Sequence, residues 1–327
     1  MLVLNRAETE SLIDLDGLRV VLASAMRDVS TRRASMPARI AAQVPDRGLL
    51  LAMPGFLPGE GALAAKLVTL FPDNAGTALA THQAVVFVFD PDTGQPVALL
   101  DGTSITTART AAGSALSADL LARQDSETLA ILGTGVQARA HARSMVRVRA
   151  IQRIRLAGRD RDRTAKLASE LRTDLQLDVE PTDSYSAACA DADIVSAVTH
   201  SPTPVVHREF LGRGVHVTSV GYNTAGRELD SATVAGALVV VESREALLAP
   251  PPAGCNDLRV PIEEGLIGPE HVHAEIGELL TGDRPGRTSP DQITLYKSVG
   301  IAAQDVAAAN LVLAGARAAG IGLEVAL

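Results

Sequence analysis

Apolar and polar positions alternate in two different ways along this chain, and the pattern changes near residue 120. Before that point, the helical periodicity of residues 15–30 is followed by strand-like runs at 39–44, 48–53, 62–70 and 84–90. The sequences AVVFVFD (84–90) and PVALLDG (96–102) flank the turn Pro91-Asp92-Thr93-Gly94, which predicts a β-hairpin. Residues 105–121 again have helical character. The first part is therefore predicted to be a mixed arrangement of helices and strands.

From residue 128 onward, short apolar strands alternate with helices. The predicted strands are 128–132, 154–157, 194–199, 215–221 and 237–242, and two of the intervening helices run to about 148 and over 163–175. This alternation predicts an α/β fold with a doubly wound parallel sheet and right-handed crossovers. After a polar surface loop (281–291) and the segment 296–298, the alanine-rich stretch 300–322 is interrupted by Gln304, Asp305, Asn310 and Arg317. It predicts an amphipathic helix packed on a globular body.

Composition narrows the function. The 327 residues carry a formal net charge of −8, which argues against a protein that binds the phosphate backbone of nucleic acids. Aromatic residues make up 2% of the chain, with five Phe, three Tyr and no Trp, so nucleobase stacking platforms and cation cages are poorly provided for. No run reaches the roughly 18 apolar residues of a membrane span, and the N-terminus lacks a signal-peptide pattern.

The two cysteines, Cys189 and Cys255, do not have the spacing of a redox or zinc motif, and no metal site is predicted. Cys189 lies in the run SAACADAD and is expected to be a small buried residue. Cys255 lies in the predicted loop PPPAGCND, where its side chain could be exposed to solvent. We expect a reduced, cytoplasmic protein.

The strongest local signal is ILGTGVQA (131–138), which reads G-x-G-x-x-A between a predicted strand and a predicted helix. Gly133 permits a tight turn, Gly135 lets the backbone approach a pyrophosphate, and the small third residue allows the helix to pack closely on the strand. Thr134, Val136 and Gln137 complete a loop whose amides favour an anion. The pattern predicts a dinucleotide site, and the alternative is a tight turn in another doubly wound protein.

The end of the second of these strands predicts which dinucleotide binds. NAD-dependent enzymes place a carboxylate there for the ribose 2′-hydroxyl, and NADP-dependent enzymes offer a cation to the 2′-phosphate. Here the position at which a carboxylate is expected is Gly158, and Arg159 and Asp160 follow it. We predict NADP(H), with Arg159 at the 2′-phosphate. Asp160 keeps NAD(H) as the alternative, and a solvated Arg159 in a charge-rich turn is the purely structural interpretation.

Four segments of the chain carry a family resemblance. They are ALATHQAVVFVFDPDTGQPVALLDGTSITTARTAAGSALSADLLA, ILGTGVQA, VTSVGYNTAGRELD and ITLYKSVGIAAQDVAAA. The chain resembles the ornithine cyclodeaminase/μ-crystallin family over residues 37–309, and TARTAA and YKSVGIA are the most specific blocks. The resemblance implies a homodimer of two-domain chains. A substrate and dimerisation domain would comprise 1–118 with 299–327, and a Rossmann domain 119–298.

The resemblance also implies a site. Arg39, Lys66 and Arg109 correspond to cations that bind the α-carboxylate of the substrate, with Arg109 also touching the cofactor. Lys66 and Arg109 lie in the runs ALAAKLVTL and ITTARTAA, where a cation needs a partner, although a solvated side chain is the usual alternative. The remaining predicted contacts are to the cofactor from Thr81, His82, Thr199, Val220, Gly221 and Lys297, and to the substrate from Tyr222. His82 has a structural role as an equal alternative, and Glu228 and Asp230 are expected to cap the next helix.

Two departures from the cyclodeaminases bear on the reaction. Those enzymes carry Asp where this chain has Asn223, and Glu where it has Leu51. A carboxylate accepts the proton that leaves a substrate ammonium, whereas an amide does not. A cyclic imine can be protonated in solution, so its reduction needs mainly a hydride and a fixed carboxylate. Asn223 would orient the imine nitrogen, and Lys66 would donate a proton if burial lowers its pKa.

The sequence therefore predicts an NAD(P)H-dependent oxidoreductase acting on a C=N bond. Its substrate would be a small 2-carboxylated cyclic imine, such as pyrroline-2-carboxylate or piperideine-2-carboxylate, reduced to the cyclic amino acid. The μ-crystallin-like reductases of the family also lack the Asp and use NADPH, which agrees with this interpretation. The alternatives are an ornithine cyclodeaminase or amino-acid dehydrogenase of the same family, and a ligand-binding protein that holds NADPH with little turnover.

Overall fold

The computed structural model describes residues 1–223, 225–250 and 253–326. The chain divides into two compact units. We call Ala111–Gly300 the central unit, and Met1–Thr110 with Ile301–Leu327 the terminal unit. The first division falls within helix α3 (Gly102–Leu121) and the second lies directly before α11 (Ala302–Ala319). Both divisions lie within ten residues of the boundaries expected from the sequence.

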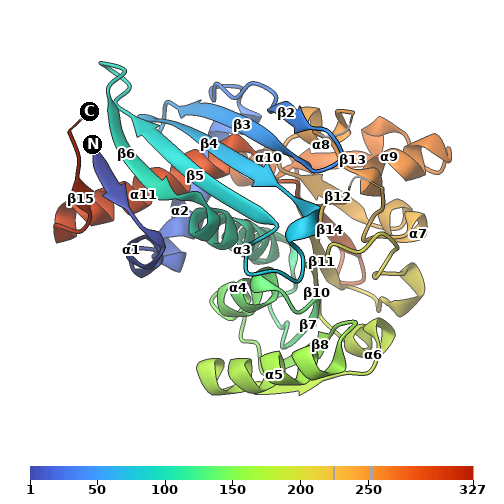
Figure 1. Cartoon of the computed structure of the whole chain (residues 1–327). Helices are drawn as coiled ribbons and strands as arrows, with labels where there is room; N and C mark the ends of the chain where they lie inside the picture. Colours follow the sequence, from blue (N-terminus) through green and yellow to red (C-terminus); the bar gives the residue numbers. More distant parts are fainter. Residues whose placement is uncertain (224, 251–252, 327) are drawn as a thin grey trace. The chain divides into compact units, whose positions relative to one another are not determined.

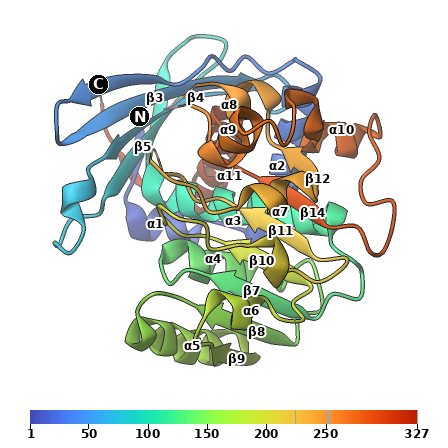
Figure 2. The same ribbon diagram turned by 90° about the vertical axis from the view of Figure 1, so that its right-hand side faces the viewer.

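An eight-stranded parallel sheet forms the centre of the central unit (Figure 1). Its order is β13 (Val272–Glu275), β12 (Leu238–Val241), β14 (Thr294–Lys297), β11 (His216–Ser219), β10 (Ile194–Ala197), β7 (Thr128–Leu132), β8 (Arg153–Ala157) and β9 (Asp178–Pro181). Figure 2 shows the succession from β12 to β9. Because successive apolar residues of these strands point to opposite faces, the sheet carries a separate buried core on each face. The predicted doubly wound parallel sheet is confirmed.

Helices of this unit include α4 (Val136–Met145), α5 (Arg161–Leu175), α6 (Tyr185–Cys189), α7 (Ser231–Ala235), α8 (Arg244–Leu248), α9 (Asn256–Glu263) and α10 (Ile276–Thr281). The strand predicted at 128–132 coincides with β7. The edge strands β9 and β13 were not predicted. Their sequences, DVEP and VHAE, contain no apolar run of the kind that identifies the inner strands.

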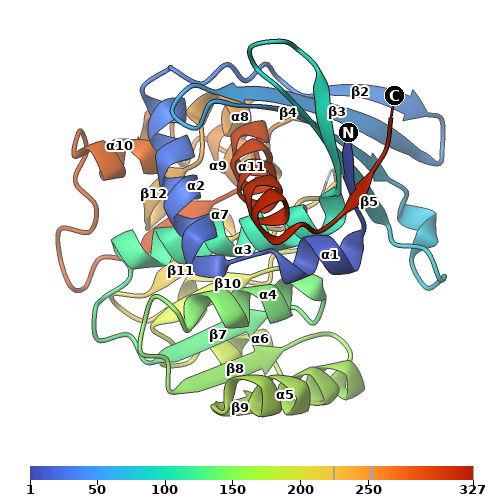
Figure 3. The ribbon, with the colours of Figure 1, turned by 90° about the vertical axis from the view of Figure 1, so that its left-hand side faces the viewer.

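A seven-stranded sheet forms the centre of the terminal unit. Its order is β15 (Leu323–Glu324), β1 (Leu2–Leu4), β6 (Pro96–Asp101), β5 (His82–Phe89), β4 (Ala62–Leu70), β3 (Gly48–Leu57) and β2 (Ile40–Val44). Strands β2 to β6 are an antiparallel meander, and the predicted hairpin is β5–β6. Helices α1 (Arg6–Ser11) and α2 (Leu15–Ser30) precede these strands. Helix α11 packs on β3, β4 and β5, and α2 packs on α11 (Figure 3).

The two faces of this sheet differ. On the face against α11, Ala62, Ala64 and Val68 of β4 are buried, whereas Leu63 and Leu67 on the other face are only half-buried. We call this other face the open face. It is apolar over several strands, because β2 to β5 place Ile40, Ala52, Leu67 and Val85 in one cross-strand row.

Helix α11 corrects one expectation. The sequence predicts a helix with one polar side, but residues 302–309 are all buried, including Gln304 and Asp305 at 1% exposure each. The polar pair is buried because it has charged and polar partners inside the terminal unit. Asn310 is half-buried and Arg317 is exposed. Within the described part of the chain, we find no helix with both the length and the apolar character needed to cross a bilayer.

Candidate active site

A buried ion-pair cluster lies in the terminal unit where β4 packs on α11. Lys66 of β4 has its Nζ 2.6 Å from Asp305 Oδ2, and the two side chains are 3% and 1% exposed. Arg109, from α3, donates from Nε to Asp305 Oδ1 at 3.0 Å and from Nη1 to Gln304 Oε1 at 2.8 Å. The structure thus brings together two of the predicted cations and adds two acceptors that were not predicted.

The local sequence explains this arrangement. Alternation along β4 directs Lys66 to the side of Ala64 and Val68, so the lysine faces α11. Gln304 and Asp305 lie in the first turns of α11, where free backbone amides favour a carboxylate. In the sequence these two residues look like polar interruptions of an alanine-rich helix. The signal that could have found them is their position at the start of a helix whose other residues are small enough to be buried on every side.

The cluster carries more positive than negative charge. Two buried cations share the carboxylate of Asp305, and half-buried Arg39 lies close enough to act on Lys66. Burial lowers the pKa of Lys66, Asp305 raises it, and Arg109 and Arg39 lower it further, so that the pKa is about 8. Arginine and lysine are the usual protein ligands of carboxylates. The arrangement therefore suits a small anionic ligand.

Apolar side chains lie on the same face of the sheet. Met53 is the cross-strand partner of Lys66, and it packs with Leu51, Val68 and Ala302 in a buried cluster. Leu51, where the cyclodeaminases carry Glu, is 4% exposed. The surroundings of the cationic cluster on β3 are thus aliphatic.

Thr81 and His82 lie where the chain enters β5 in the terminal unit. Thr81 Oγ1 and His82 Nδ1 are 3.0 Å apart, and the carbonyl of Thr81 accepts a hydrogen bond from the Phe71 amide. His82 is exposed and Thr81 half-buried. A cofactor contact from either residue stays a prediction.

In the central unit, the predicted dinucleotide turn has the backbone that such a turn needs. Gly133 follows β7 with φ 128°, and its amide donates to the Ala157 carbonyl at 2.8 Å. Gly135 is the N-cap of α4 and has no capping side chain. Apart from its two chain neighbours, no described residue lies within 4 Å of the place where its Cβ would stand. The uncapped amides and the space beside Gly135 fit a pyrophosphate.

The side chains of this loop leave the turn accessible. Ala138 is fully buried, which allows α4 to pack closely on the sheet, whereas Val136 is exposed and Thr134 half-buried. Among the described residues, the Oε1 atom of Gln137 has no hydrogen-bond partner. Gln137 therefore retains an acceptor for a ligand.

The three residues after β8 differ in what they offer. A Cβ at Gly158 would stand 2.5 Å from Thr134 Cγ2, so the turn has no room for a carboxylate side chain there. Asp160 caps α5, where its side chain accepts from the Arg163 amide at 3.0 Å. Arg159 is exposed. Its charge acts on Tyr185: burial raises the pKa of that tyrosine, and Arg159 partly offsets the rise. The carboxylate is thus engaged in capping, whereas the guanidinium is accessible to solvent.

One buried carboxylate holds the carboxyl ends of β10 and β11. Glu228 Oε1 accepts from the amide and hydroxyl of Thr199 at 2.5 and 2.7 Å, and Oε2 accepts from the Gly221 amide at 2.7 Å and the Ser219 hydroxyl at 2.8 Å. A side chain at position 221 would collide with this carboxylate. Glu228 therefore fixes the strand ends at the edge where open α/β sheets bind ligands.

The expectation that Glu228 caps the following helix is wrong. Four donors hold it at 2% exposure between the strand ends, away from the helix start. The same expectation for Asp230 is confirmed, since its carboxylate accepts from the Thr233 amide at 2.7 Å at the start of α7.

Lys297, at the end of β14, is fully buried at the same edge. Its Nζ donates to the Gly221 carbonyl at 2.7 Å and to Ser219 Oγ at 3.0 Å, and lies 3.0 Å from Asp257 Oδ2. Burial lowers the pKa of Lys297, but Asp257, Cys255 and Glu228 together raise it above its ordinary value. These bonds fix the backbone of Gly221, and direct contact of Lys297 with a cofactor stays a prediction.

Asn223 lies two residues further along the loop. Its Oδ1 accepts from the amides of Ala225 and Gly226 at 2.9 and 3.0 Å, and its Nδ2 donates to the His200 carbonyl at 3.2 Å. The amide side chain thus stabilises its own loop, and a bond to a substrate nitrogen stays a prediction. The neighbouring Val220 and Tyr222 are both half-buried.

The cysteines lie outside this chemistry. Cys189 is buried as predicted, but Cys255 is also buried, because it packs in the core of the central unit. Burial raises the pKa of each thiol to about 12. Neither side chain is a nucleophile near neutral pH.

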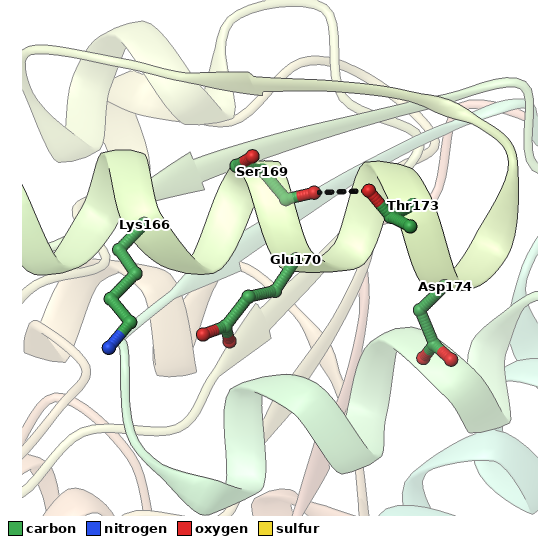
Figure 4. A pocket seen from close by; sticks show the side chains of 5 residues that line it. All are labelled: Lys166, Ser169, Glu170, Thr173 and Asp174. Atoms are coloured by element: carbon green, nitrogen blue, oxygen red, sulfur yellow. Dashed lines mark hydrogen bonds between the residues drawn. The ribbon is translucent and has the colours of Figure 1, made fainter.

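A surface depression on α5 is also separate from the predicted site. Figure 4 shows its lining residues, which are Lys166, Ser169, Glu170, Thr173 and Asp174. Glu170 is paired with Arg139 of α4, and Asp174 Oδ2 lies 2.6 Å from Arg143 Nε. The depression therefore lies on the polar side of α5, where two of its carboxylates pair with arginines of α4.

The turn, the uncapped α4 and the parallel sheet define a dinucleotide-binding protein of the Rossmann type. A family model described as "Ornithine cyclodeaminase/mu-crystallin family" matches residues 1–319. The chain belongs to this family.

Three relatives illustrate the likeness. A Delta(1)-pyrroline-2-carboxylate reductase of Bacillus cereus is 34% identical over 325 residues, 98% of each chain. The structure of Thermococcus litoralis Delta(1)-pyrroline-2-carboxylate reductase in complex with NADH and L-proline superposes with a TM-score of 0.95 and 35% identity, covering 99% of this chain and 100% of that one. An archaeal alanine dehydrogenase dimer with bound NAD has a TM-score of 0.91 and 30% identity, covering 100% of this chain and 99% of that one.

Proposed function

We propose that this protein reduces a small 2-carboxylated cyclic imine, of the pyrroline-2-carboxylate or piperideine-2-carboxylate type, to the cyclic amino acid with NAD(P)H. The observation that carries the proposal is the pair of buried cations, Lys66 and Arg109, that share Asp305 beside an aliphatic wall. A monocarboxylate with an apolar ring matches both features. The reductase of Bacillus cereus and the Thermococcus litoralis complex with L-proline support this substrate class.

The reduction adds a hydride to the carbon of the C=N bond and a proton to its nitrogen. When bound, the nicotinamide supplies the hydride. Arg109 and Lys66, together with Arg39, bind the carboxylate, and Asp305 and Gln304 hold the guanidinium of Arg109 in place. Fixing the carboxylate also fixes the ring attached to it, so positioning contributes much of the catalysis.

Lys66 is the proposed proton donor. A pKa of about 8 leaves it largely protonated at neutral pH and still able to release its proton. The cyclodeaminases carry carboxylates where this chain has Leu51 and Asn223. Neither of these side chains accepts a proton from an ammonium group, so the oxidation of a diamine is disfavoured. Asn223 orients the ring nitrogen in this proposal.

The proposed cofactor preference is NADP(H). Asp160 is engaged as a helix cap, Gly158 offers no carboxylate, and Arg159 is exposed. Arg159 follows the second strand of the dinucleotide fold, the position from which such enzymes bind the ribose 2′-hydroxyl or 2′-phosphate. The relatives solved with NADH and NAD support a nicotinamide dinucleotide as such. The choice between the two rests on these three residues of this chain.

The proposed assembly is a homodimer formed through the open face of the terminal unit. Ile40, Leu50 and Val85 on this face are 69%, 39% and 38% exposed, and apolar patches of this kind mark protein interfaces. The alanine dehydrogenase dimer supports this assembly. The two free, buried cysteines fit a reducing, cytoplasmic location.

One assay separates the candidate functions. The purified protein is given pyrroline-2-carboxylate or piperideine-2-carboxylate with NADPH or NADH, and the loss of absorbance of the reduced cofactor is followed. A parallel reaction contains ornithine and oxidised cofactor, and released ammonia is measured. We expect imine-dependent oxidation of NADPH and no ammonia. Ammonia together with proline at comparable rates would contradict the interpretation of Asn223 and favour a cyclodeaminase, and no oxidation with either imine would favour a binding protein.

Arg159→Ala tests the cofactor preference. Loss of a charge-assisted contact to the 2′-phosphate is expected to raise the Kd for NADPH by about tenfold or more and to leave the Kd for NADH unchanged. Arg161→Ala is the matched control, because Arg161 is exposed in the same turn and pairs with Asp183 at 3.4 Å. Equal effects of Arg159→Ala on both cofactors contradict the assignment.

A further inference from the structure

Asp305 is the residue on which the cationic cluster of the terminal unit depends. Its two oxygens are divided between the two buried cations, with Oδ1 3.0 Å from Arg109 Nε and Oδ2 2.6 Å from Lys66 Nζ. Its neighbour Gln304 accepts from Arg109 Nη1 at 2.8 Å. Each cation is thus oriented by a fixed acceptor on α11.

Asp305 is the charged group that acts most strongly on Lys66. The charged groups facing it are Asp305 from α11, Arg109 from α3 and Arg39 from the segment before β2. Its partners on the adjacent strands are the apolar Met53 and Val86. A buried ammonium group beside two guanidinium groups loses its proton easily unless a carboxylate stabilises the charged form.

Resting on the proposed function, we propose that Asp305 is a positioning residue that keeps Lys66 protonated and orients the guanidinium of Arg109, and so sets the upper pH limit of the reaction. Asp305 does not touch the reacting atoms. It acts through Lys66, which binds the carboxylate and donates the proton only while it is charged.

The direction of the effect follows from the charges. Burial, Arg109 and Arg39 lower the pKa of Lys66, and Asp305 opposes them. Replacing the carboxylate with an amide removes the opposing charge, so the pKa of Lys66 falls below about 8. The fall of kcat/KM at high pH, which we call the alkaline limb, then moves to lower pH. Deprotonation of the substrate imine also lowers kcat/KM at high pH, and it does so equally for all variants. The test is therefore the difference in the position of the alkaline limb between variants.

The first experiment compares pH profiles of kcat/KM for pyrroline-2-carboxylate. Asp305→Asn is expected to move the alkaline limb down by about one pH unit or more, the usual effect of one adjacent charge. Gln304→Ala is the matched control, because it removes an acceptor of Arg109 without changing the charge on Lys66. It is expected to raise KM and to leave the limb in place. An unmoved limb in folded Asp305→Asn overturns the proposal.

A second experiment does not need turnover. The sequence contains three lysines, Lys66, Lys166 and Lys297, so a full-length protein labelled with ¹³C at lysine Cε gives three resonances, which Lys66→Arg and Lys166→Arg assign. The Lys66 resonance is expected to titrate at lower pH in Asp305→Asn than in the wild type. If Asp305→Asn does not fold alone, the charge is removed in a background that has also lost Arg109, so that a cation and an anion leave together. The Lys66 resonance is expected to titrate at lower pH in the double variant Arg109→Met/Asp305→Asn than in Arg109→Met.

These outcomes separate the inference from the proposed function. A shifted Lys66 resonance in a protein that reduces no imine supports the role of Asp305 and contradicts the proposed substrate. An active enzyme in which neither the limb nor the resonance moves in Asp305→Asn contradicts the role of Asp305 alone. Equal titration of Lys66 in Arg109→Met and in Arg109→Met/Asp305→Asn also overturns it.

Discussion

At the scale of single residues, the two buried lysines show how partners decide the behaviour of a charge. Lys66 shares its carboxylate with an arginine, and its pKa is lowered to about 8 because burial outweighs Asp305. Lys297 is also fully buried, but Asp257, Cys255 and Glu228 outweigh burial and raise its pKa. Lys66 is therefore suited to releasing a proton, whereas Lys297 is suited to holding the backbone around Gly221.

Lys66→Arg tests the proposed proton donor. Arginine keeps the positive charge but does not deprotonate in proteins, so kcat is expected to fall by about 10²- to 10⁴-fold with a smaller change in KM. The alkaline limb due to Lys66 is expected to disappear between pH 6 and 10. The measurement is steady-state kinetics with each imine. Lys166→Arg, on the exposed face of α5, should behave as the wild type, and a Lys66→Arg enzyme with unchanged kcat contradicts the assignment.

The sequence indicated the two cations of the buried cluster, Lys66 and Arg109, but not Asp305, the carboxylate that pairs with them. Lys66 and Arg109 stood out because charged residues are rare inside apolar runs. Asp305 is 196 positions from Arg109 along the chain, and nothing in its local sequence names that partner. Glu228 was assigned to the wrong role for the same reason, since the strand ends that it binds are brought to it only by the fold.

At the scale of elements, two buried histidines join helices and strands of the central unit. His141 of α4 has Nδ1 2.8 Å from the Gln137 carbonyl and Nε2 2.9 Å from Ser114 Oγ of α3. His216 of β11 has Nε2 3.1 Å from Ser117 Oγ and Nδ1 2.9 Å from Thr294 Oγ1 of β14. Burial lowers the pKa of His141 to about 4 and, with the fields of Arg287 and Arg149, that of His216 to about 3.

These shifts predict acid sensitivity. Below the ordinary histidine pKa of about 6.5 the unfolded chain binds protons that the folded chain does not, so stability falls by up to about 1.4 kcal/mol per pH unit per histidine as the pH drops from about 6.5 towards 4. His141→Asn is expected to narrow the gap between urea midpoints at pH 7 and pH 5. His200→Asn, at an exposed position, serves as the control. An unchanged gap in His141→Asn contradicts the prediction.

The elements themselves were predictable where burial imposes a pattern. The helix α2 and the strands β4 and β7 coincide with their predicted bounds, because each has a clear apolar period or run. The edge strands and the five-residue helices α6, α7 and α8 have too few apolar residues to show a period. Their places are set by the sheet on which they pack.

At the scale of the whole molecule, the scarce phenylalanines are concentrated on the open face. Phe56, Phe87 and Phe89 follow its alternation on β3 and β5, which is three of the five phenylalanines in the chain. An aliphatic and aromatic face at a sheet surface is stabilised when another apolar face covers it. The low aromatic content that disfavoured nucleobase stacking is therefore compatible with an apolar interface.

Leu67→Lys tests the proposed homodimer. Leu67 lies between Ala52 and Val85 in the middle of the open face, where a buried charge without a partner destabilises an interface. The variant is expected to have half the wild-type mass by light scattering coupled to size-exclusion chromatography. Val20→Lys is the control, because Val20 is 63% exposed on α2, away from the open face. A monomeric wild type, or a dimeric Leu67→Lys, contradicts the proposal.

The Asn223 loop has a consequence for how reactions change within such a fold. Aspartate has nearly the shape of asparagine and would keep the two backbone donors of Ala225 and Gly226. It has no N–H for the His200 carbonyl, however, so a carboxylate oxygen would face a carbonyl oxygen across a hydrogen-bond distance. An exchange at this one position would therefore strain the backbone that holds it. A change of reaction at this position would therefore require the loop and the residues that anchor it to be replaced together.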